Sequence, residues 1–426
     1  MSKNRRSRVG RQRSAETQVQ TALPIGDFVR QTLLETVLIA GLAYVKEVLE
    51  SEREALCGPR YEHADGRAAY RAGHVASSLV LGGRRLAVER PRVRTTGREE
   101  VALPSWVAWS DTDPLEERAV EQMIVGVSTR DYERSLEPLP DTLHGRATSK
   151  STVSRRFVRG TQQHLHKLLA RPIPEDLAVL VLDGVHVAEH VVVTAVGVDP
   201  EGKKHVLGLC EGASENATTC ASLLDNLVER GLRTDRSLLV VIDGSKALRR
   251  AVRARFGDRA LVQRCQEHKK RNVLDALPKG KRDSVKRALN EAYRTREVVR
   301  ARKMLENLAR RLDQEHPGAA ASLREGLDEL LTVKALGLDQ QLERSLSTTN
   351  LIENLIGNAR DVAARVKRWR GGRMILRWCA AGVLEAERHF HRIKGCKHMQ
   401  YLCAALHRRD EELDGIRTSG SAVAAA

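Results

Sequence analysis

Two apolar runs of the same design stand in the middle of the chain. Leu177–Gly184 reads LAVLVLDG and Ser237–Gly244 reads SLLVVIDG, so each is a run of β-favouring residues that ends in an acid. Such runs predict buried strands, and a buried strand rarely holds a carboxylate without a reason. Asp183 and Asp243 are therefore candidate functional residues, although each alone also fits an ordinary strand-end charge.

The pattern around these runs predicts an alternating α/β segment. Period-two and period-3.6 stretches give the order β-β-β-α-β-α-β. In chain order these elements are expected over Leu177–Gly184, His190–Val198, Lys204–Cys210, Glu215–Arg230, Ser237–Gly244, Ser245–Arg255 and Ala260–Cys265. This order matches a ribonuclease-H-like core, in which the first and fourth strands are neighbours. We therefore expect Asp183 and Asp243 to meet.

Beyond this segment the pattern is helical throughout. Apolar residues recur at helical spacing with dense charges between them over residues 267–344, which predicts an all-helical insertion. Ser347–Asn358 (STTNLIENLIGN) follows and places Glu353 on a helix, and Met374–Ile393 is a last long helix. The fold class is thus α/β: a ribonuclease-H-like catalytic domain over 175–266 and 345–395, interrupted by the insertion, with a C-terminal tail over 396–426.

The N-terminal part, residues 21–170, reads as a mostly helical DNA-binding region. It begins with a helix over Ile25–Leu56 and an Arg-rich hairpin over Arg71–Arg94. The strand pair of this hairpin could grip a phosphate backbone, or its face could simply be solvated. A helix over Leu115–Val125, a second over Thr129–Leu136 and a third capped by Ser149 or Ser151 resemble a helix-turn-helix. Its groove-facing candidates include Thr152, Arg155 and Arg156.

Charge narrows the class of partner. The chain of 426 residues holds 72 Lys and Arg against 55 Asp and Glu, a net charge of +17. Such an excess favours a polyanion through phosphate neutralisation, and residues 1–20 form a basic tail that we expect to be disordered. No apolar run is long enough to span a membrane, and the seven scattered cysteines suggest reduced thiols. We expect a cytoplasmic protein.

Six ordered motifs between Gly126 and Gly395 carry a family resemblance. They are GVSTRDYERSLEPL, LDGVHV, VLGLCEGASENATT, VVIDGSKALRRAV, QRCQEHKKRNVLDALP and STTNLIEN. With them the chain resembles a bacterial insertion-sequence transposase of the Mutator-like family, which carries an acidic DDE triad. The resemblance implies an enzyme, nucleoid-associated when bound to DNA, that binds terminal inverted repeats and performs metal-dependent DNA cleavage and strand transfer.

The resemblance also implies which residues form the site. Asp183, Asp243 and Glu353 would be both the catalytic residues and the metal ligands. Hard divalent cations prefer oxygen ligands, so two Mg²⁺ (or Mn²⁺) ions are expected there. Three carboxylates on separate elements repel one another without metal, so they should be costly to stability and useful only to function.

Two further groups of residues flank the expected site. Cys265 and His268 match a Cys–His pair of the family; two ligands do not make a zinc site, and we expect a structural or site-bordering pair. A basic patch follows Glu353 and would contact DNA, whereas the Trp369 within it either stacks on a base or is packed. The basic patch consists of Arg365, Lys367, Arg368, Arg370 and Arg373.

The expected partner is double-stranded DNA, both the terminal repeats and the target. Holding two DNA ends requires at least a homodimer, an inference from the reaction. Two alternatives stay open: a ribonuclease-H-like nuclease or resolvase without strand transfer, and a degenerate element protein that acts as a DNA-binding regulator.

Overall fold

The computed structural model describes residues 23–62, 66–81, 84–111, 115–136, 145–147, 149–212, 217–363, 366 and 368–424. The chain divides into two compact units. The first comprises Met1–Arg118 and Arg130–Thr152, and the second comprises Ala119–Thr129 and Val153–Ala426. The basic tail expected over residues 1–20 lies outside the described residues.

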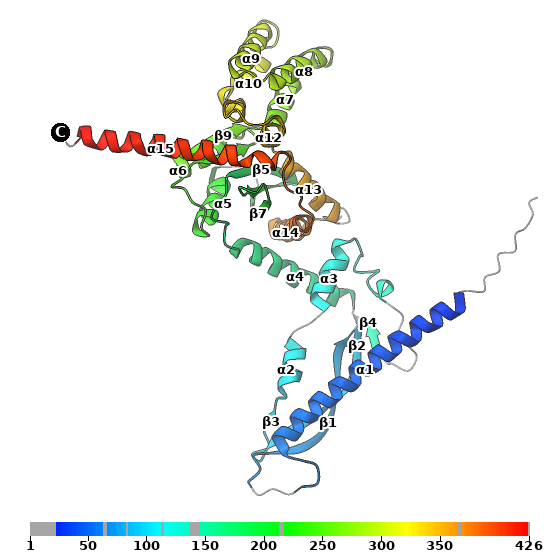
Figure 1. Ribbon diagram of the computed structural model, residues 1–426. Coiled ribbons are helices and arrows are strands. Elements are labelled where there is room, and N and C mark those ends of the chain that lie inside the picture. Colours follow the sequence, from blue (N-terminus) through cyan, green and yellow to red (C-terminus); the bar gives the residue numbers. More distant parts are fainter. Residues whose placement is uncertain are drawn as a thin grey trace, which may run out of the picture. The chain divides into compact units, whose positions relative to one another are not determined.

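The first unit is built on a long helix and a hairpin (Figure 1). Helix α1 (Leu23–Cys57) packs against the antiparallel strands β1 (Ala69–Leu81) and β2 (Arg84–Thr95). Val45 and Leu49 of α1 share one apolar cluster with residues of both strands. The remaining elements are β3 (Glu100–Val101) and β4 (Gly145–Ala147), which both pair with β2, and α2 (Pro104–Asp111). The turn expected at Gly82–Gly83 lies outside the described residues.

The arginines of the hairpin are partly occupied within the chain. Arg90 and Arg92 both pair with Glu100, at 2.9 and 2.6 Å, and Arg85 donates to the Ser78 hydroxyl at 3.0 Å. These pairs link β2 to its neighbouring strands. The observed contacts therefore favour arginines that are paired within the chain over arginines that are available to bind phosphates.

The expected helix-turn-helix lacks its second helix. Helix α3 (Leu115–Ile124) and helix α4 (Lys150–Ala170) form, and the Ser149 hydroxyl accepts the Thr152 amide at the start of α4. Between them, Thr129–Leu136 was expected to be helical, but only Glu133–Ser135 form a single 3₁₀ turn. Leu136 is already extended, and Pro138 stands two residues further on, where a helix is expected to have ended.

The second unit contains a mixed five-stranded sheet with the order β7-β6-β5-β8-β9. β5 pairs antiparallel with β6 and parallel with β8, and β9 extends the parallel side. The strands are β5 (Val179–Val187), β6 (His190–Val198), β7 (Lys204–Gly212), β8 (Leu238–Ile242) and β9 (Ala260–Arg264), with helices α5 (Ala217–Glu229) and α6 (Lys246–Phe256) between them. This arrangement is consistent with a ribonuclease-H-like core, and the expected order of elements is confirmed.

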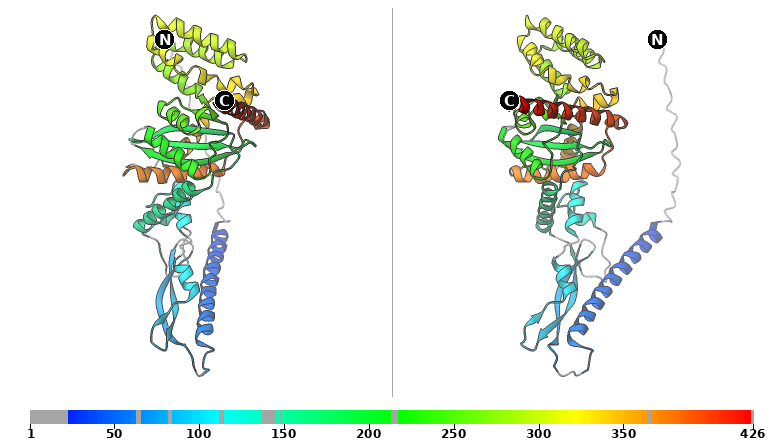
Figure 2. Two further views of the ribbon diagram at one scale, coloured as in Figure 1. Left: turned by 90° about the vertical axis from the view of Figure 1, so that its left-hand side faces the viewer. Right: turned by 60° about the vertical axis from the view of Figure 1, so that its left-hand side comes forward.

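Alternating residues divide the sheet into two faces. In β5, Leu180 and Leu182 join the apolar cluster under α5 and α6, whereas Val179 and Val181 join the cluster on the opposite face. That second cluster also includes residues of α13 (Asn350–Ala363), α14 (Gly372–Arg388) and α15 (Met399–Ala424). Figure 2 shows α14, in orange, running alongside the sheet. Asp183 has the parity of Val181 and therefore faces the α13 side.

Residues 267–344 contain no strand in the structure, as the periodicity predicted. Pro278 is the N-cap of α8, and Pro317 begins α10, so both prolines stand where the helix pattern breaks. The helices are α7 (Gln266–Asp275), α8 (Lys279–Arg294), α9 (Val298–Asp313), α10 (Pro317–Arg324), α11 (Thr332–Ala335) and α12 (Gln340–Leu346), with a 3₁₀ turn at Asp328–Leu330.

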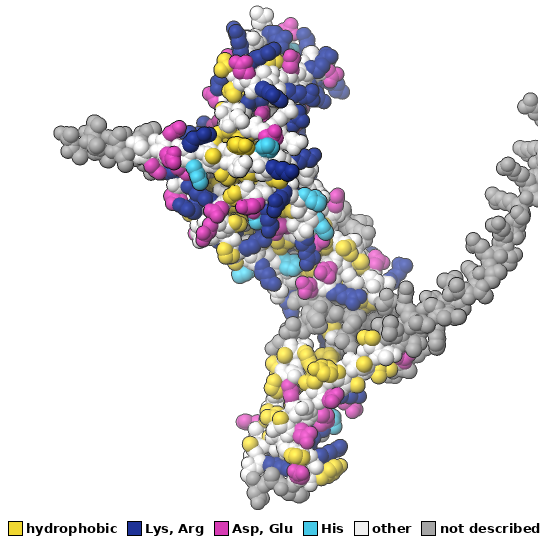
Figure 3. Space-filling model, viewed as in Figure 1, with side chains coloured by type: hydrophobic (Ala, Val, Ile, Leu, Met, Phe, Trp, Pro, Cys, Tyr) yellow, Lys and Arg dark blue, Asp and Glu magenta, His cyan; other side chains and the backbone are white. Residues whose placement is uncertain are grey.

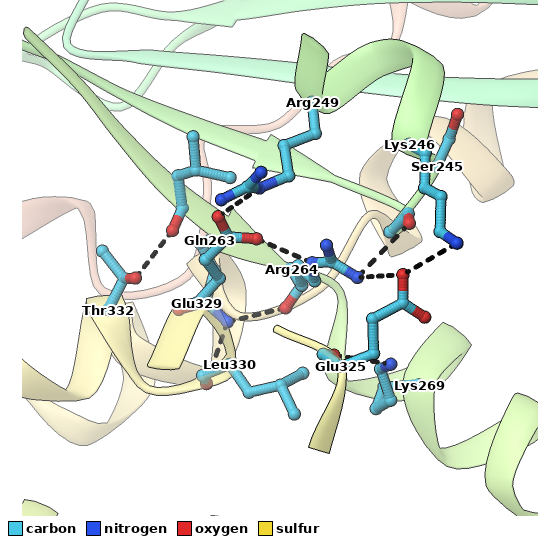
Figure 4. Close-up of polar contacts among 12 residues, drawn as sticks. Ser245, Lys246, Arg249, Gln263, Arg264, Lys269, Glu325, Glu329, Leu330 and Thr332 are labelled. Atoms are coloured by element: carbon cyan, nitrogen blue, oxygen red, sulfur yellow. Dashed lines mark hydrogen bonds and ion pairs between the residues drawn. The ribbon is translucent and has the colours of Figure 1, made fainter. Parts of the chain in front are cut away.

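A buried polar network joins this helical segment to the sheet (Figure 4). Nε of Arg264, on β9, donates to Glu329 at 2.7 Å, and Arg249 of α6 reaches the same carboxylate at 2.5 Å. The side-chain amide of Gln263 donates to the Leu330 carbonyl at 3.0 Å and its oxygen accepts the Val333 amide at 2.9 Å. The helical segment is therefore anchored to the end of the sheet.

The expected C-terminal tail is different in the structure. Residues 399–424 form helix α15, whose Met399, Leu402 and Leu406 are buried in the same apolar cluster as residues of α13 and α14. Asp410 of the same helix accepts from Arg259 at 2.6 Å and from the Ser237 amide at 2.7 Å. None of the described helices is both long and apolar enough to cross a membrane.

Candidate active site

The two aspartates occupy neighbouring positions on adjacent parallel strands. The last parallel pair between β5 and β8 is Leu182 with Ile242, so Asp183 and Asp243 follow it side by side. The strand β5 itself runs on to Val187 as a hairpin with β6, so Asp183 lies inside the strand and not at its end. The expected meeting of the two acids is confirmed.

Asp183 is held in a buried position, where the nearby His268 and Thr349 only partly offset the cost of its charge. Its exposed fraction is 1%, and neither carboxylate oxygen has a hydrogen-bond partner among the described residues. Burial, reinforced by the negative charge of Asp243, raises the pKa of Asp183 to about 8. A buried, unsatisfied carboxyl group is costly, and a cation bound beside it would offset that cost.

Asp243 lies in the short connection between strand β8 and helix α6. Its Oδ1 accepts the Ser245 amide at 2.8 Å, and the Ser245 hydroxyl in turn caps α6 by accepting the Leu248 amide at 3.3 Å. Gly244, with φ of 109°, allows the sharp turn between them. Burial raises the pKa of Asp243 as well. The turn therefore fixes this carboxylate beside Asp183.

Glu353 lies on the first turn of helix α13. Its Oε1 lies 3.5 Å from Nε2 of His268 and 3.6 Å from Nη2 of Arg271. Its side chain is half-buried, and an acid in a first helical turn is favoured by the helix dipole. Glu353 thus completes an acidic site formed by two strands and one helix.

Asp183, His268 and Glu353 have potential ligand atoms that all lie within 4.8 Å of one another. Asp243 is not a member of this group of three, but the register of β5 and β8 places it next to Asp183. Carboxylate oxygens suit Mg²⁺ or Mn²⁺, whereas an imidazole nitrogen is a more usual ligand of Zn²⁺ and other transition metals, so the two carboxylates are the members of this group that fit Mg²⁺. The donor set therefore fits a divalent cation.

His268 is the member of the site that the sequence did not assign to it. The buried thiol of Cys265 caps α7, accepting the His268 amide at 3.5 Å, and also accepts the Thr349 amide at 3.3 Å. The Thr349 hydroxyl lies 3.2 Å from Nδ1 of His268. The pair borders the site, with Cys265 tying α7 to α13. The signal available in the sequence was a Cys–His spacing directly after the strand next to that of Asp243.

The candidate DNA-contacting residues have different surroundings. On α4, Arg155 is exposed and Thr152 partly so, whereas Arg156 is buried with 7% of its surface exposed. This burial counts against a groove-facing role for Arg156, which stays an untested candidate. All three arise from one helix, but Thr152 belongs to the first unit and the arginines to the second.

The basic patch after Glu353 is only partly described. Arg365 and Lys367 lie outside the described residues, and Arg368, Arg370 and Arg373 are exposed. Trp369 is half-buried and packs against two apolar clusters, so the packed alternative has support.

Comparison with known proteins identifies the family of the chain. The family described as "Transposase, Mutator family" matches residues 11–390. The chain is 28% identical over 345 residues to the transposase for insertion sequence element IS905 of Lactococcus lactis, covering 78% of this chain and 82% of that protein. It is 25% identical over 354 residues to the transposase for insertion sequence element IS256 in transposon Tn4001 of Staphylococcus aureus, covering 80% and 86%. The chain belongs to the Mutator family of transposases of bacterial insertion sequences.

Proposed function

We propose that this transposase binds the terminal inverted repeats of its insertion sequence and catalyses metal-dependent cleavage and strand transfer at Asp183, Asp243 and Glu353. The sheet and its helices would act as a ribonuclease-H-like catalytic domain. The observation that carries the proposal is the burial of Asp183. Its two oxygens have no hydrogen-bond partner among the residues that the structure describes, and its neighbours are Asp243 and the Glu353–His268 pair.

The residues have distinct tasks in this proposal. Asp183 and Asp243 would bind metal from the sheet, and Glu353 would bind from α13. Two bound divalent ions would activate the attacking water or 3′-hydroxyl and stabilise the leaving oxygen. His268, 3.5 Å from Glu353, would orient that carboxylate, and Arg271, half-exposed at 3.6 Å, would hold a phosphate close to the acids.

The proposed substrate is double-stranded DNA, as repeat ends and as target. The net charge of +17 suits a phosphate backbone. Because two element ends react together, we propose that the active form on DNA is at least a homodimer.

The triad substitutions test this function. Asp183→Asn, Asp243→Asn and Glu353→Gln keep side-chain volume and remove one ligand charge each, so magnesium-dependent cleavage of a labelled repeat-end duplex should fall by orders of magnitude. Binding of the uncleaved duplex should persist. Asp258→Asn is the matched control. Asp258 is exposed and does not belong to the acidic site, and its carboxylate pairs with Arg253 at a distance of 3.6 Å. Near wild-type cleavage by Glu353→Gln would refute the assignment.

A second assay separates the alternatives. With a pre-cleaved repeat end and a plasmid target, a transposase joins the end to the plasmid, whereas a nuclease or resolvase only cuts. A protein that binds the repeats and does neither, with all three acids intact, would be a regulator.

A further inference from the structure

A polar cavity of about 710 Å³ lies next to the acidic site. Its walls come from α7, α8, α12 and the start of α13, with the connection before α12. All of these elements belong to the second unit. The cavity therefore opens where the helical segment meets the catalytic helix.

The cavity and the acidic site share two walls. On α7, Glu267 and Lys270 line the cavity, whereas His268 faces Glu353. Before α13, Thr348 and Asn350 line the cavity, whereas the intervening Thr349 contacts His268. A strand of DNA that leaves the acids along these two elements would enter the cavity next.

The acids that line the cavity are already engaged inside the protein. Glu267 pairs with Lys270 at 2.6 Å, and Glu343 pairs with the buried Lys334. Asp339 caps α12 by accepting the Gln341 amide at 2.8 Å. None of these carboxylates needs a cation from outside.

The remaining charges of the cavity are all positive. Arg294, Arg296 and Arg344 line it and are exposed, and none of them has an ion pair or hydrogen bond among the described residues. Figure 3 shows Lys and Arg side chains gathered over the helices α8 and α9. The unbalanced charge therefore calls for an anion.

A hydroxyl group adds a neutral donor. Tyr293 lines the cavity, and its buried Oη has no hydrogen-bond partner within the described part of the chain. Burial raises the pKa of Tyr293, so the group stays protonated and able to donate. Buried hydroxyls normally have a partner, and an anion would supply one.

We propose that this cavity binds the phosphodiester backbone of the DNA strand that continues from the acidic site. The inference rests on the proposed function and adds where the substrate lies. Arginine guanidinium groups match phosphate oxygens in a two-pronged geometry, and backbone contacts position DNA without reading its sequence. The contribution of the cavity should be the same for every DNA sequence.

The test neutralises the three arginines together in the full-length chain, as Arg294→Gln/Arg296→Gln/Arg344→Gln. Each lost phosphate contact should reduce the slope of log affinity against log salt by about 0.9, so the slope should fall by about 2 to 3. Arg300→Gln is the matched control, because Arg300 is exposed on α9 and does not line the cavity. The thermal midpoint of each variant shows whether it is folded.

Two assays with different DNA substrates identify which DNA strand the cavity binds. Loss of affinity and cleavage with a repeat-end duplex assigns the cavity to the element end. Full end cleavage with reduced joining of a pre-cleaved end to a plasmid assigns it to the target. An unchanged salt slope with unchanged cleavage and joining overturns the inference and leaves the triad assignment standing. Tyr293→Phe, which removes only the hydroxyl, should weaken whichever arm the arginines affect.

Discussion

Nε2 of His268 lies 3.5 Å from Oε1 of Glu353, although the two residues come from different helices. The contact exists because the Cys265 thiol accepts amide hydrogens from both sides, at the start of α7 and just before α13. A shift of either helix would therefore move both the imidazole and the acid.

This contact predicts a specific defect for His268→Ala. Removing a group that orients a metal-binding carboxylate lowers metal affinity by about 10- to 100-fold, so the Mg²⁺ concentration for half-maximal cleavage should rise by that factor. Repeat-end binding and the thermal midpoint should stay near wild type. His186→Ala is the control, because His186 is exposed on β5 three residues beyond Asp183. An unchanged magnesium dependence in His268→Ala would show that the contact is only structural.

The buried Asp183 predicts how stability depends on pH in EDTA. Its pKa is about 8 when folded and about 3.9 when unfolded. Between these values the folded protein holds a proton that the unfolded chain has lost, so this group lowers the free energy of unfolding progressively as pH rises from about 4 to 8. Asp183→Asn should therefore gain more stability over wild type at pH 8 than at pH 5 in urea unfolding.

Magnesium supplies the control for that measurement. At pH 8 it should stabilise the wild type more than Asp183→Asn, since only the wild type offers the full ligand set. The same stability difference between the two proteins at both pH values would contradict the raised pKa.

Two neighbouring acids give a matched test of the network that anchors the helical segment. Glu329 pairs with the buried Arg264, their side chains being 12% and 5% exposed, whereas Asp328 is exposed and pairs with Arg302. Breaking a buried pair leaves an uncompensated charge, so Glu329→Gln should cost about 3 kcal/mol of unfolding free energy. Asp328→Asn should change it by about 0.5 kcal/mol or less. Equal effects in urea unfolding would mean that the network does not anchor the segment.

Adjacent arginines on α4 separate DNA contact from packing. Arg155 is exposed, so Arg155→Ala should weaken repeat-end binding in a gel-shift titration while leaving the thermal midpoint unchanged. Arg156 is buried, so Arg156→Ala should lower the midpoint. If Arg155→Ala binds the repeats as wild type does, repeat recognition uses other residues.

Local sequence patterns were sufficient to predict most elements of the second unit. Uninterrupted apolar runs such as LVLD and VVID mark strands buried on both faces, and helical periodicity marks residues 267–344, because both signals depend on local spacing. The order of these elements also predicted that Asp183 and Asp243 would be neighbours. The same local reasoning was wrong for Thr129–Leu136, where only Glu133–Ser135 form a 3₁₀ turn.

The surroundings of the three acids could not be predicted from local patterns, because they depend on tertiary packing. Three features depend on which residues, distant in the chain, pack together: the His268–Glu353 contact, the oxygens of Asp183 and the arginines of the cavity, the last two without partners in the part of the chain that the structure describes. The same holds for α15, whose Met399 and Leu402 become buried only because the sheet offers them an apolar face. Local sequence patterns specify which side of an element is apolar, but not which partner covers it, and the chemistry of a site is fixed by that partner.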